Sequence, residues 1–278
     1  MLVNIQAVPL VVFVLGGCSK ESRWTASEGW VMKVTETIFL VGGGETETVF
    51  TDRMDCNVYL MKAGDFYVLI DAGGGMGVDQ ILENIRGHGV DPARVEWLLL
   101  THAHGDHAGG ATSLKQRLPN LKVAISAEAA DWLRSGDEKA INLDKGRTTG
   151  MYPAEFQFLP CPVDVELQDE QELELGDKVF QVVATPGHCA GHMSFLVEDG
   201  GKRALFAGDA IFPEGKILLQ NIGDCDLHQS IRSVERLFQL HPDHLFAGHR
   251  RPIVNEAVSH FKPATDRIAA LVIPRNLF

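Results

Sequence analysis

Short apolar runs alternate with amphipathic segments along the chain, in two successive groups. Runs rich in Val, Ile, Tyr and Phe predict strands, and longer segments with helical spacing predict helices. In the first group we expect strands at residues 33–41, 56–61, 66–70, 95–101 and 123–126, with helices at 78–88 and 111–118. In the second group we expect strands at 179–184, 193–197, 204–207 and 244–247, with helices at 227–240 and 257–271. Strands with helices on both sides predict a layered α/β architecture.

Between the two groups, residues 136–167 show weak periodicity. An irregular segment of this length is often a lid or another functional loop. We therefore expect a lid-like insertion within a single domain that covers residues 32–278. Four side chains in or next to it are candidates for shaping substrate choice, with ordinary packing of the lid as the alternative: Trp132, Met151, Tyr152 and Phe156.

Composition and charge narrow the class of protein. Hydrophobic residues make up 45% of the 278 residues and charged residues 22%, which is ordinary for a soluble globular protein. The net charge of −12 disfavours a nucleic-acid partner, because nucleic-acid binders usually carry a basic patch. No run reaches the roughly 20 apolar residues of a transmembrane helix. The five cysteines are widely spaced and predict no disulfide scaffold.

The first 31 residues have more than one interpretation. The stretch "AVPLVVFVLGGCSK" is typical of a bacterial lipoprotein signal with Cys18 as the lipidated residue, although residues 1–6 lack the usual positive charge. Alternatively, the natural start is Met32, and residues 1–31 are an extension. The first interpretation predicts a membrane-anchored lipoprotein and the second a cytoplasmic protein. A third is an apolar arm that packs on the domain or on a partner subunit.

The densest group of candidate metal ligands lies in "LLLTHAHGDHAGG", directly after an apolar run. His102 and His104 alternate at the end of a predicted strand, so both can point to one side. Asp106 and His107 follow in the turn toward the next helix. Histidines with carboxylates suit zinc, or iron or manganese at similar sites. Four ligands from one loop fit two ions better than one, because adjacent side chains diverge. Further ligands are therefore expected elsewhere.

Three later segments supply candidates of the same kind. His188 in "ATPGHCAGH", Asp209 in "ALFAGDAIF" and His249 in "HLFAGHRRP" each follow a predicted strand and a glycine. Each of them alone is a weak signal, because most loop histidines and aspartates are solvated. Together with the HxHxDH cluster, they form a strong pattern for a metal site.

This order of HxHxDH, His, Asp and His resembles the metallo-β-lactamase fold superfamily of hydrolases. The resemblance covers the chain from about residue 33 to its end and implies an αββα four-layer sandwich, two mixed β-sheets flanked by helices. It further implies two metal ions, with Asp209 bridging them. The implied ligands of the first ion are His102, His104 and His188, and those of the second are Asp106, His107 and His249. Asp71 and His192 are expected to support these ligands from behind.

The resemblance also implies a mechanism. Two neighbouring cations lower the pKa of a bound water from 15.7 to about 7, which supplies a hydroxide nucleophile. Asp106 is then the catalytic residue that orients this hydroxide. No covalent intermediate is expected.

The substrate class follows from motif details. An aspartate at position 209 favours glyoxalase II, lactonase and phosphodiesterase relatives over true β-lactamases. Phe212 stands where lactonases carry a tyrosine, and the 29 residues after His249 are too few for the glutathione-holding domain of glyoxalase II. We therefore expect hydrolysis of an ester-type bond in a small molecule, first a lactone (including acyl-homoserine lactones) or a carboxylic ester.

The alternative functions, in descending rank, are a glyoxalase II-like thioesterase and then a β-lactamase or a phosphodiesterase. A diiron redox module is the non-hydrolase alternative. The expected partner is a small-molecule substrate and no nucleic acid, and a homodimer is compatible with the sequence.

Overall fold

The computed structural model describes residues 32–44 and 50–278. The predictions about residues 1–31 and Cys18 lie outside these residues. Among the described residues, no helix combines the length and apolar character that crossing a bilayer requires.

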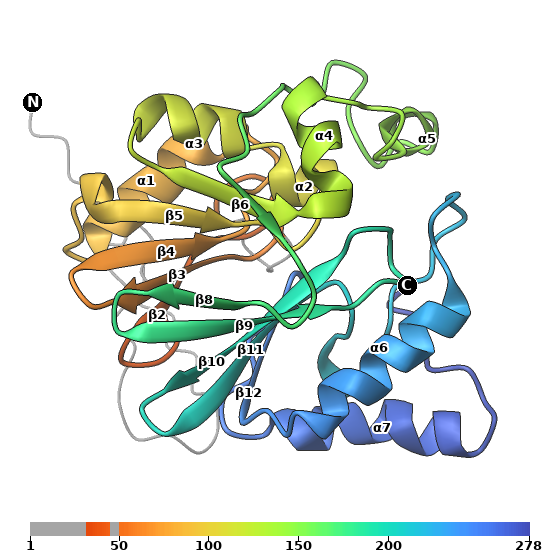
Figure 1. The fold of residues 1–278 in the computed structure, drawn as a ribbon. Coiled ribbons are helices and arrows are strands. Elements are labelled where there is room, and N and C mark those ends of the chain that lie inside the picture. Colours follow the sequence, from red (N-terminus) through yellow and green to blue (C-terminus); the bar gives the residue numbers. More distant parts are fainter. Residues whose placement is uncertain (1–31, 45–49) are drawn as a thin grey trace, which may run out of the picture.

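Two β-sheets form the centre of the molecule (Figure 1). The first runs in sequence order through β1 (Met32–Lys33), β2 (Ile38–Gly42), β3 (Val58–Ala63), β4 (Phe66–Ile70), β5 (Val95–Leu99), β6 (Lys122–Ser126) and β7 (Val165–Leu167). Its strands β1 to β4 pair antiparallel, and β4 to β7 pair parallel. The second has the order β12-β11-β10-β9-β8, made by β8 (Glu172–Leu175), β9 (Lys178–Ala184), β10 (Met193–Asp199), β11 (Lys202–Gly208) and β12 (His244–Ala247). Only β11 and β12 pair parallel in it.

Both faces of each sheet are buried, and the period of two along the strands explains why. In β4, Val68 faces the other sheet while Leu69 faces the helices. In β11, Phe206 faces the other sheet and Leu205 faces the helices. Successive side chains of a strand point to opposite faces, so a continuous apolar run supplies two cores at once.

Helices cover the outer face of each sheet (Figure 1). The first sheet packs against α1 (Val78–Gly87), α2 (Gly105–Ala108), α3 (Ala111–Arg117) and α4 (Ala127–Ser135). The second sheet packs against α6 (Leu227–Gln239) and α7 (Ala257–Ala269). Two short 3-10 turns, η1 (Pro92–Arg94) and η2 (Pro213–Gly215), complete the connections. The predicted αββα sandwich of two mixed sheets is confirmed.

The structure differs from the sequence expectations in several elements. The expected strand 33–41 is a hairpin of β1 and β2, because the Thr35 hydroxyl accepts hydrogen bonds from the N–H groups of Thr37 and Ile38 and turns the chain. The amphipathic edge strand β8 and the helices α2 and α4 were not expected. Residues 136–167 are not wholly irregular, since they contain the short helix α5 (Leu143–Thr148) and end in β7.

Candidate metal centre

The predicted ligands come together at one edge of the sandwich. His102 and His104 follow β5, and Asp106 and His107 lie in α2 directly after them. The remaining three follow strands of the second sheet, with His188 after β9, Asp209 after β11 and His249 after β12. Because β9, β11 and β12 run in one direction, their carboxyl ends share an edge. Sequence-distant side chains are thereby brought to one place.

Three histidines form the first cluster. His104 Nδ1 lies 3.1 Å from His102 Nε2 and 3.0 Å from His188 Nε2. Nitrogen ligands about 2.0–2.1 Å from a tetrahedral zinc lie roughly 3.3 Å apart, so this spacing is close to that of a bound ion. His102 Nδ1 contacts the Thr101 hydroxyl at 3.0 Å, and His188 Nδ1 contacts the Leu218 carbonyl at 3.3 Å. Those contacts leave each Nε2 lone pair directed at the cluster.

Asp106, His107 and His249 form the second cluster. Asp106 Oδ2 lies 3.2 Å from His249 Nε2 and 3.6 Å from His107 Nε2. Asp209 faces both clusters: its Oδ1 is 3.5 Å from His107 Nε2, and its Oδ2 is 3.6 Å from His188 Nε2. The geometry therefore brings all seven predicted ligands together in two adjoining groups.

Two buried atoms test whether metal ions fit here. Within the described part of the chain, His107 Nε2 and Asp209 Oδ1 have no hydrogen-bond partner. An unsatisfied buried polar atom costs about 1–3 kcal/mol, and a cation between these two atoms would satisfy both. Histidine nitrogens and carboxylate oxygens are also the donors that zinc and similar ions accept. The donor set therefore fits metal ions.

Asp71 lies behind the second cluster, next to His107. Its Oδ2 is 2.9 Å from His107 Nδ1, and its carboxylate accepts hydrogen bonds from the backbone N–H and the hydroxyl of Thr101. The Thr101 hydroxyl donates to Asp71, so His102 Nδ1 must donate to that hydroxyl. One carboxylate thus fixes the tautomers of two histidines. Asp71 adopts a left-handed φ of 64°, a conformation uncommon for residues other than glycine.

His192 supports Asp209 and is not directed at either cluster. Its Nε2 accepts the backbone N–H of Asp209 at 3.0 Å, and its Nδ1 lies 2.8 Å from the Thr185 hydroxyl. Both ring nitrogens are thus engaged away from the clusters. Burial, aided by the neighbouring His188, lowers the pKa of His192 well below its ordinary value. A neutral ring is what the hydrogen bond from Asp209 requires.

The centre is electrostatically suited to cations. Burial alone would raise the pKa of Asp209, but His249 and His107 outweigh it and hold that pKa well below its ordinary value. Burial likewise opposes the ionisation of Asp106, and His107 and His249 again overcome it. Both carboxylates are therefore ionised inside a largely buried site, paired with imidazoles whose protons a bound metal ion would replace.

Tyr152 is a functional contact that sequence reasoning identified only as part of a lid. Its hydroxyl donates to Asp106 Oδ1 at 2.6 Å and accepts the Asp106 backbone N–H at 3.2 Å. Burial and the adjacent Asp106 raise the pKa of Tyr152 well above its ordinary value, so the phenol stays protonated. The close approach requires Gly105, because a Cβ there would lie 2.9 Å from the Phe156 ring and 3.1 Å from that of Tyr152.

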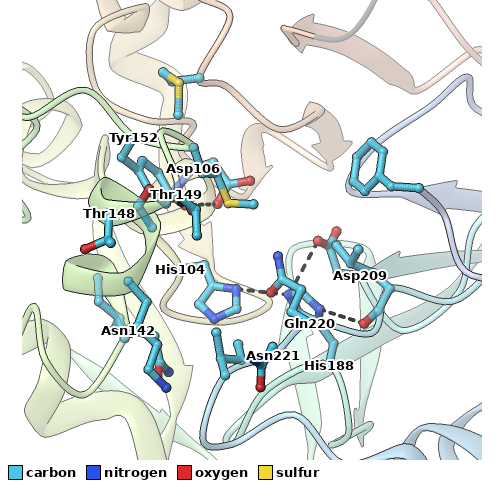
Figure 2. Close-up of a pocket in the computed structure, with 18 of the residues that line it drawn as sticks. His104, Asp106, Asn142, Thr148, Thr149, Tyr152, His188, Asp209, Gln220 and Asn221 are labelled. Carbon is cyan, nitrogen blue, oxygen red and sulfur yellow. Dashed lines mark hydrogen bonds and ion pairs between the residues drawn. The ribbon is translucent and has the colours of Figure 1, made fainter.

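A pocket of about 760 Å³ opens over the clusters (Figure 2). His104, Asp106, His188 and Asp209 line it. Its walls combine apolar side chains, amides and hydroxyls with charged side chains. The apolar and neutral polar ones are Met54, Ile141, Met151, Leu218, Ile222, Asn142, Thr148, Thr149, Gln220 and Asn221, and the charged ones are Arg53, Asp55, Asp144 and Lys145. Of the four side chains proposed to shape substrate choice, Met151 and Tyr152 line it. Trp132 and Phe156 pack against the core of the first sheet, and their proposed role in substrate choice is therefore not supported.

Comparisons with known proteins agree with this architecture. The family model of the metallo-beta-lactamase superfamily matches residues 51–249. Lactamase-like protein adaB of Aspergillus niger is 28% identical over 195 residues, which are 69% of this chain and 50% of the relative. An atrochrysone carboxyl ACP thioesterase of Aspergillus chevalieri is 27% identical over 169 residues, 60% of this chain and 44% of the relative. The chain therefore spans about half the length of these two relatives.

Solved structures share the fold at lower sequence identity. The native FEZ-1 metallo-beta-lactamase from Legionella gormanii superposes with a TM-score of 0.66 at 20% identity, covering 89% of this chain and 98% of that structure. This likeness concerns the arrangement of strands and helices alone. Taken with the family match over most of the chain and the His/Asp clusters at the sheet edge, it leads to one conclusion: the chain belongs to the metallo-beta-lactamase superfamily.

Proposed function

We propose that this protein is a binuclear metal-dependent hydrolase that cleaves an ester-type bond in a small molecule. A lactone, including acyl-homoserine lactones, or a carboxylic ester is the first candidate substrate. The observation that carries the proposal is the pair of adjoining clusters at an open pocket, with Asp209 facing both. Separate clusters joined by one carboxylate favour two ions over one.

The ligand assignment follows the two clusters. His102, His104 and His188 would hold the first ion. Asp106, His107 and His249 would hold the second, and Asp209 would contact both. Two zinc ions are proposed, with iron or manganese as alternatives for the same donors. When bound, such ions activate water as a nucleophile and polarise the substrate carbonyl.

The protein's own residues would position the reaction. Asp106 lines the pocket, and its Oδ2 is directed toward the second cluster, where it can orient the attacking water. Asp71 and Thr101 hold the imidazoles of His107 and His102 in the tautomers that expose Nε2. No serine or cysteine is among the described residues that line the pocket, which supports direct attack by water without a covalent intermediate.

The pocket walls support an acyl substrate. A volume of about 760 Å³ lies within the usual range of small-molecule sites. Leu218, Ile141 and Ile222 offer apolar contact to an acyl group, and Asn142 and Gln220 offer amides to its polar atoms. Phe212, which replaces the tyrosine of lactonases, is fully buried, so it supplies no contact to a substrate.

Thioester hydrolysis is the second candidate. The similarity to an ACP thioesterase favours it, since that relative is 27% identical to this chain over 169 residues. β-Lactam and phosphodiester cleavage rank lower, and a diiron redox module is the non-hydrolase alternative. Two redox-active irons per chain with oxygen consumption would favour that alternative.

The test is a substrate screen with the zinc-loaded protein. We expect a lactone or a carboxylic ester to give the highest kcat/KM among lactones, carboxylic esters, thioesters, phosphodiesters and a β-lactam. Excess chelator should abolish hydrolysis, and zinc should restore it. Activity that persists after verified metal removal contradicts the mechanism. A β-lactam as the best substrate contradicts the proposed substrate class and leaves the metal centre intact.

A further inference from the structure

One hydroxyl connects the insertion to the metal centre. Tyr152 lies between α5 and β7, and only 8% of its surface is exposed. Its hydroxyl contacts Asp106 twice, donating to Oδ1 at 2.6 Å and accepting the backbone N–H at 3.2 Å. Figure 2 shows the two side chains facing each other on the side of the pocket formed by Thr148 and Thr149. Asp106 is thus fixed from the insertion at both its backbone and its carboxylate.

The tyrosine is itself firmly held within the insertion. Its ring centroid lies 4.9 Å from that of Phe156, and its backbone N–H donates to the Gly146 carbonyl at 3.2 Å. Gly146 permits this contact, because a Cβ there would come within 2.5 Å of the tyrosine ring. Arg147 closes the loop by donating to both carboxylate oxygens of Glu138 at 2.8 Å and to the Phe156 carbonyl. These contacts hold the loop that places the hydroxyl next to Asp106.

The contact leaves one carboxylate oxygen of Asp106 for the cluster. An aspartate side chain rotates about two bonds, so an unrestrained carboxylate would sample several orientations. With Oδ1 held by the tyrosine, Oδ2 lies 3.2 Å from His249 Nε2 and 3.6 Å from His107 Nε2. Those distances direct Oδ2 at the place where the second ion would bind.

We propose that Tyr152 is a positioning residue for Asp106 and couples binding of the second metal ion to the order of the insertion. The inference rests on the proposed two-ion centre and not on the identity of the substrate. Thermodynamic linkage makes the coupling reciprocal. An ordered insertion strengthens binding of the second ion, and the bound ion stabilises the insertion.

The first test is Tyr152→Phe, which removes the hydroxyl and retains the ring that packs on Phe156. We expect the second zinc ion to bind about 10-fold more weakly, as for other residues that orient metal ligands, with the first ion unchanged. Stepwise dissociation constants from calorimetry or a competing chelator measure this without any assay of hydrolysis. The matched control is Tyr67→Phe, because Tyr67 is a second buried tyrosine, in β4 and outside the pocket.

The second test measures the reciprocal effect, which is the effect of the bound ion on the insertion. Hydrogen exchange of peptides covering residues 138–156 should slow when zinc is added to the wild type, and this slowing should be smaller in Tyr152→Phe. Wild-type affinity for both ions in Tyr152→Phe, or an equal slowing of exchange, overturns the inference while the two-ion centre stands. A wild type that binds only one ion contradicts the proposed function itself, and the inference falls with it.

Discussion

The tautomers of His102 and His107 depend on one buried carboxylate. Asp71 accepts from Thr101 and lies 2.9 Å from His107 Nδ1, with 2% of its surface exposed. Its role combines two unusual costs, a buried charge and a left-handed backbone. Both are tolerated because the carboxylate accepts hydrogen bonds from several donors at once.

Asp71→Asn tests this arrangement. Asparagine tolerates the left-handed backbone and keeps the size of the side chain, but it removes the negative charge that holds His107. We expect the affinity of the second ion to fall by about 10- to 100-fold. Zinc content after dialysis against a weak chelator measures the loss. Asp79→Asn, at an exposed carboxylate of α1, is the control, and two ions retained in Asp71→Asn would contradict this role.

His88 gives a pH-dependent prediction at a position remote from the centre. Burial, reinforced by the nearby Lys33, lowers the pKa of His88 from 6.5 to about 4. The unfolded chain therefore takes up this proton at higher pH than the folded chain does. Its neutral form contributes stability that is fully present above pH 6.5 and is lost as the pH falls from 6.5 toward 4.

His88→Gln should accordingly lose less stability on acidification than the wild type. After allowance for partial solvent screening, we expect a difference on the order of 1 kcal/mol between pH 7 and pH 4.5. Urea unfolding at each pH, with chelator present throughout, measures it. His228→Gln, at an exposed histidine of α6, should follow the wild type. Parallel pH profiles for wild type and His88→Gln would show that His88 does not contribute.

At the scale of elements, the insertion packs against the HxHxDH segment at a glycine, where a larger residue would not fit. Gly105 begins α2, and the rings of Tyr152 and Phe156, which follow α5 in the chain, pack directly against it. Alanine is favoured over glycine by about 1 kcal/mol in a helix interior, and by less at the first helical position. At Gly105, however, a Cβ would lie 2.9 Å from the Phe156 ring.

Gly105→Ala should therefore destabilise the protein despite the gain in helix propensity. We expect a loss of about 1–3 kcal/mol from overpacking, accompanied by lower kcat, because the displaced insertion no longer holds Asp106. Urea unfolding of the zinc-loaded protein and steady-state kinetics provide the two readouts. Gly223→Ala is the matched control, since a Cβ there meets open space. Increased stability in Gly105→Ala would mean that the rings move aside freely.

The elements themselves were largely predictable, because their apolar periodicity is local. The helix expected at residues 227–240 is α6, Leu227–Gln239, and the strand expected at 244–247 is β12. The contact from Tyr152 to Asp106 was not predictable, because it joins residues 46 positions apart across an insertion with weak periodicity. Edge strand β8 was missed for a related reason, since alternating Leu and Glu over four residues is too short a signal.

At the scale of the whole molecule, the candidate centre lies where the two sheets meet. Four of its side chains come from the first sheet's edge and three from the second's, so bound ions would join the two halves. The sequence could single out all seven as candidates, because each follows an apolar run and a motif marks the group. Their distances and the role of His192 in holding Asp209 required the structure.

Asp209→Asn tests the proposed link between the halves. Asparagine keeps the size but removes the charge that faces both clusters, so we expect one ion to be lost. The fall in kcat should exceed the rise in KM, because the defect lies in stabilising the transition state. Retention of both ions with full activity would show that Asp209 is not a ligand, and the grounds for ranking β-lactams low would be lost with it.

Metal ions should also stabilise the wild-type fold, because they bind the folded state and join its two halves. A ligand present at 100 times its dissociation constant adds about 2.7 kcal/mol to the free energy of unfolding. We expect zinc to raise the unfolding midpoint of the wild type in urea, and to raise that of Asp209→Asn by a clearly smaller increment. The increment is the informative quantity, because removing a buried charge changes the stability of the metal-free protein by itself. Equal increments in both proteins would show that Asp209 does not help to hold the stabilising ion.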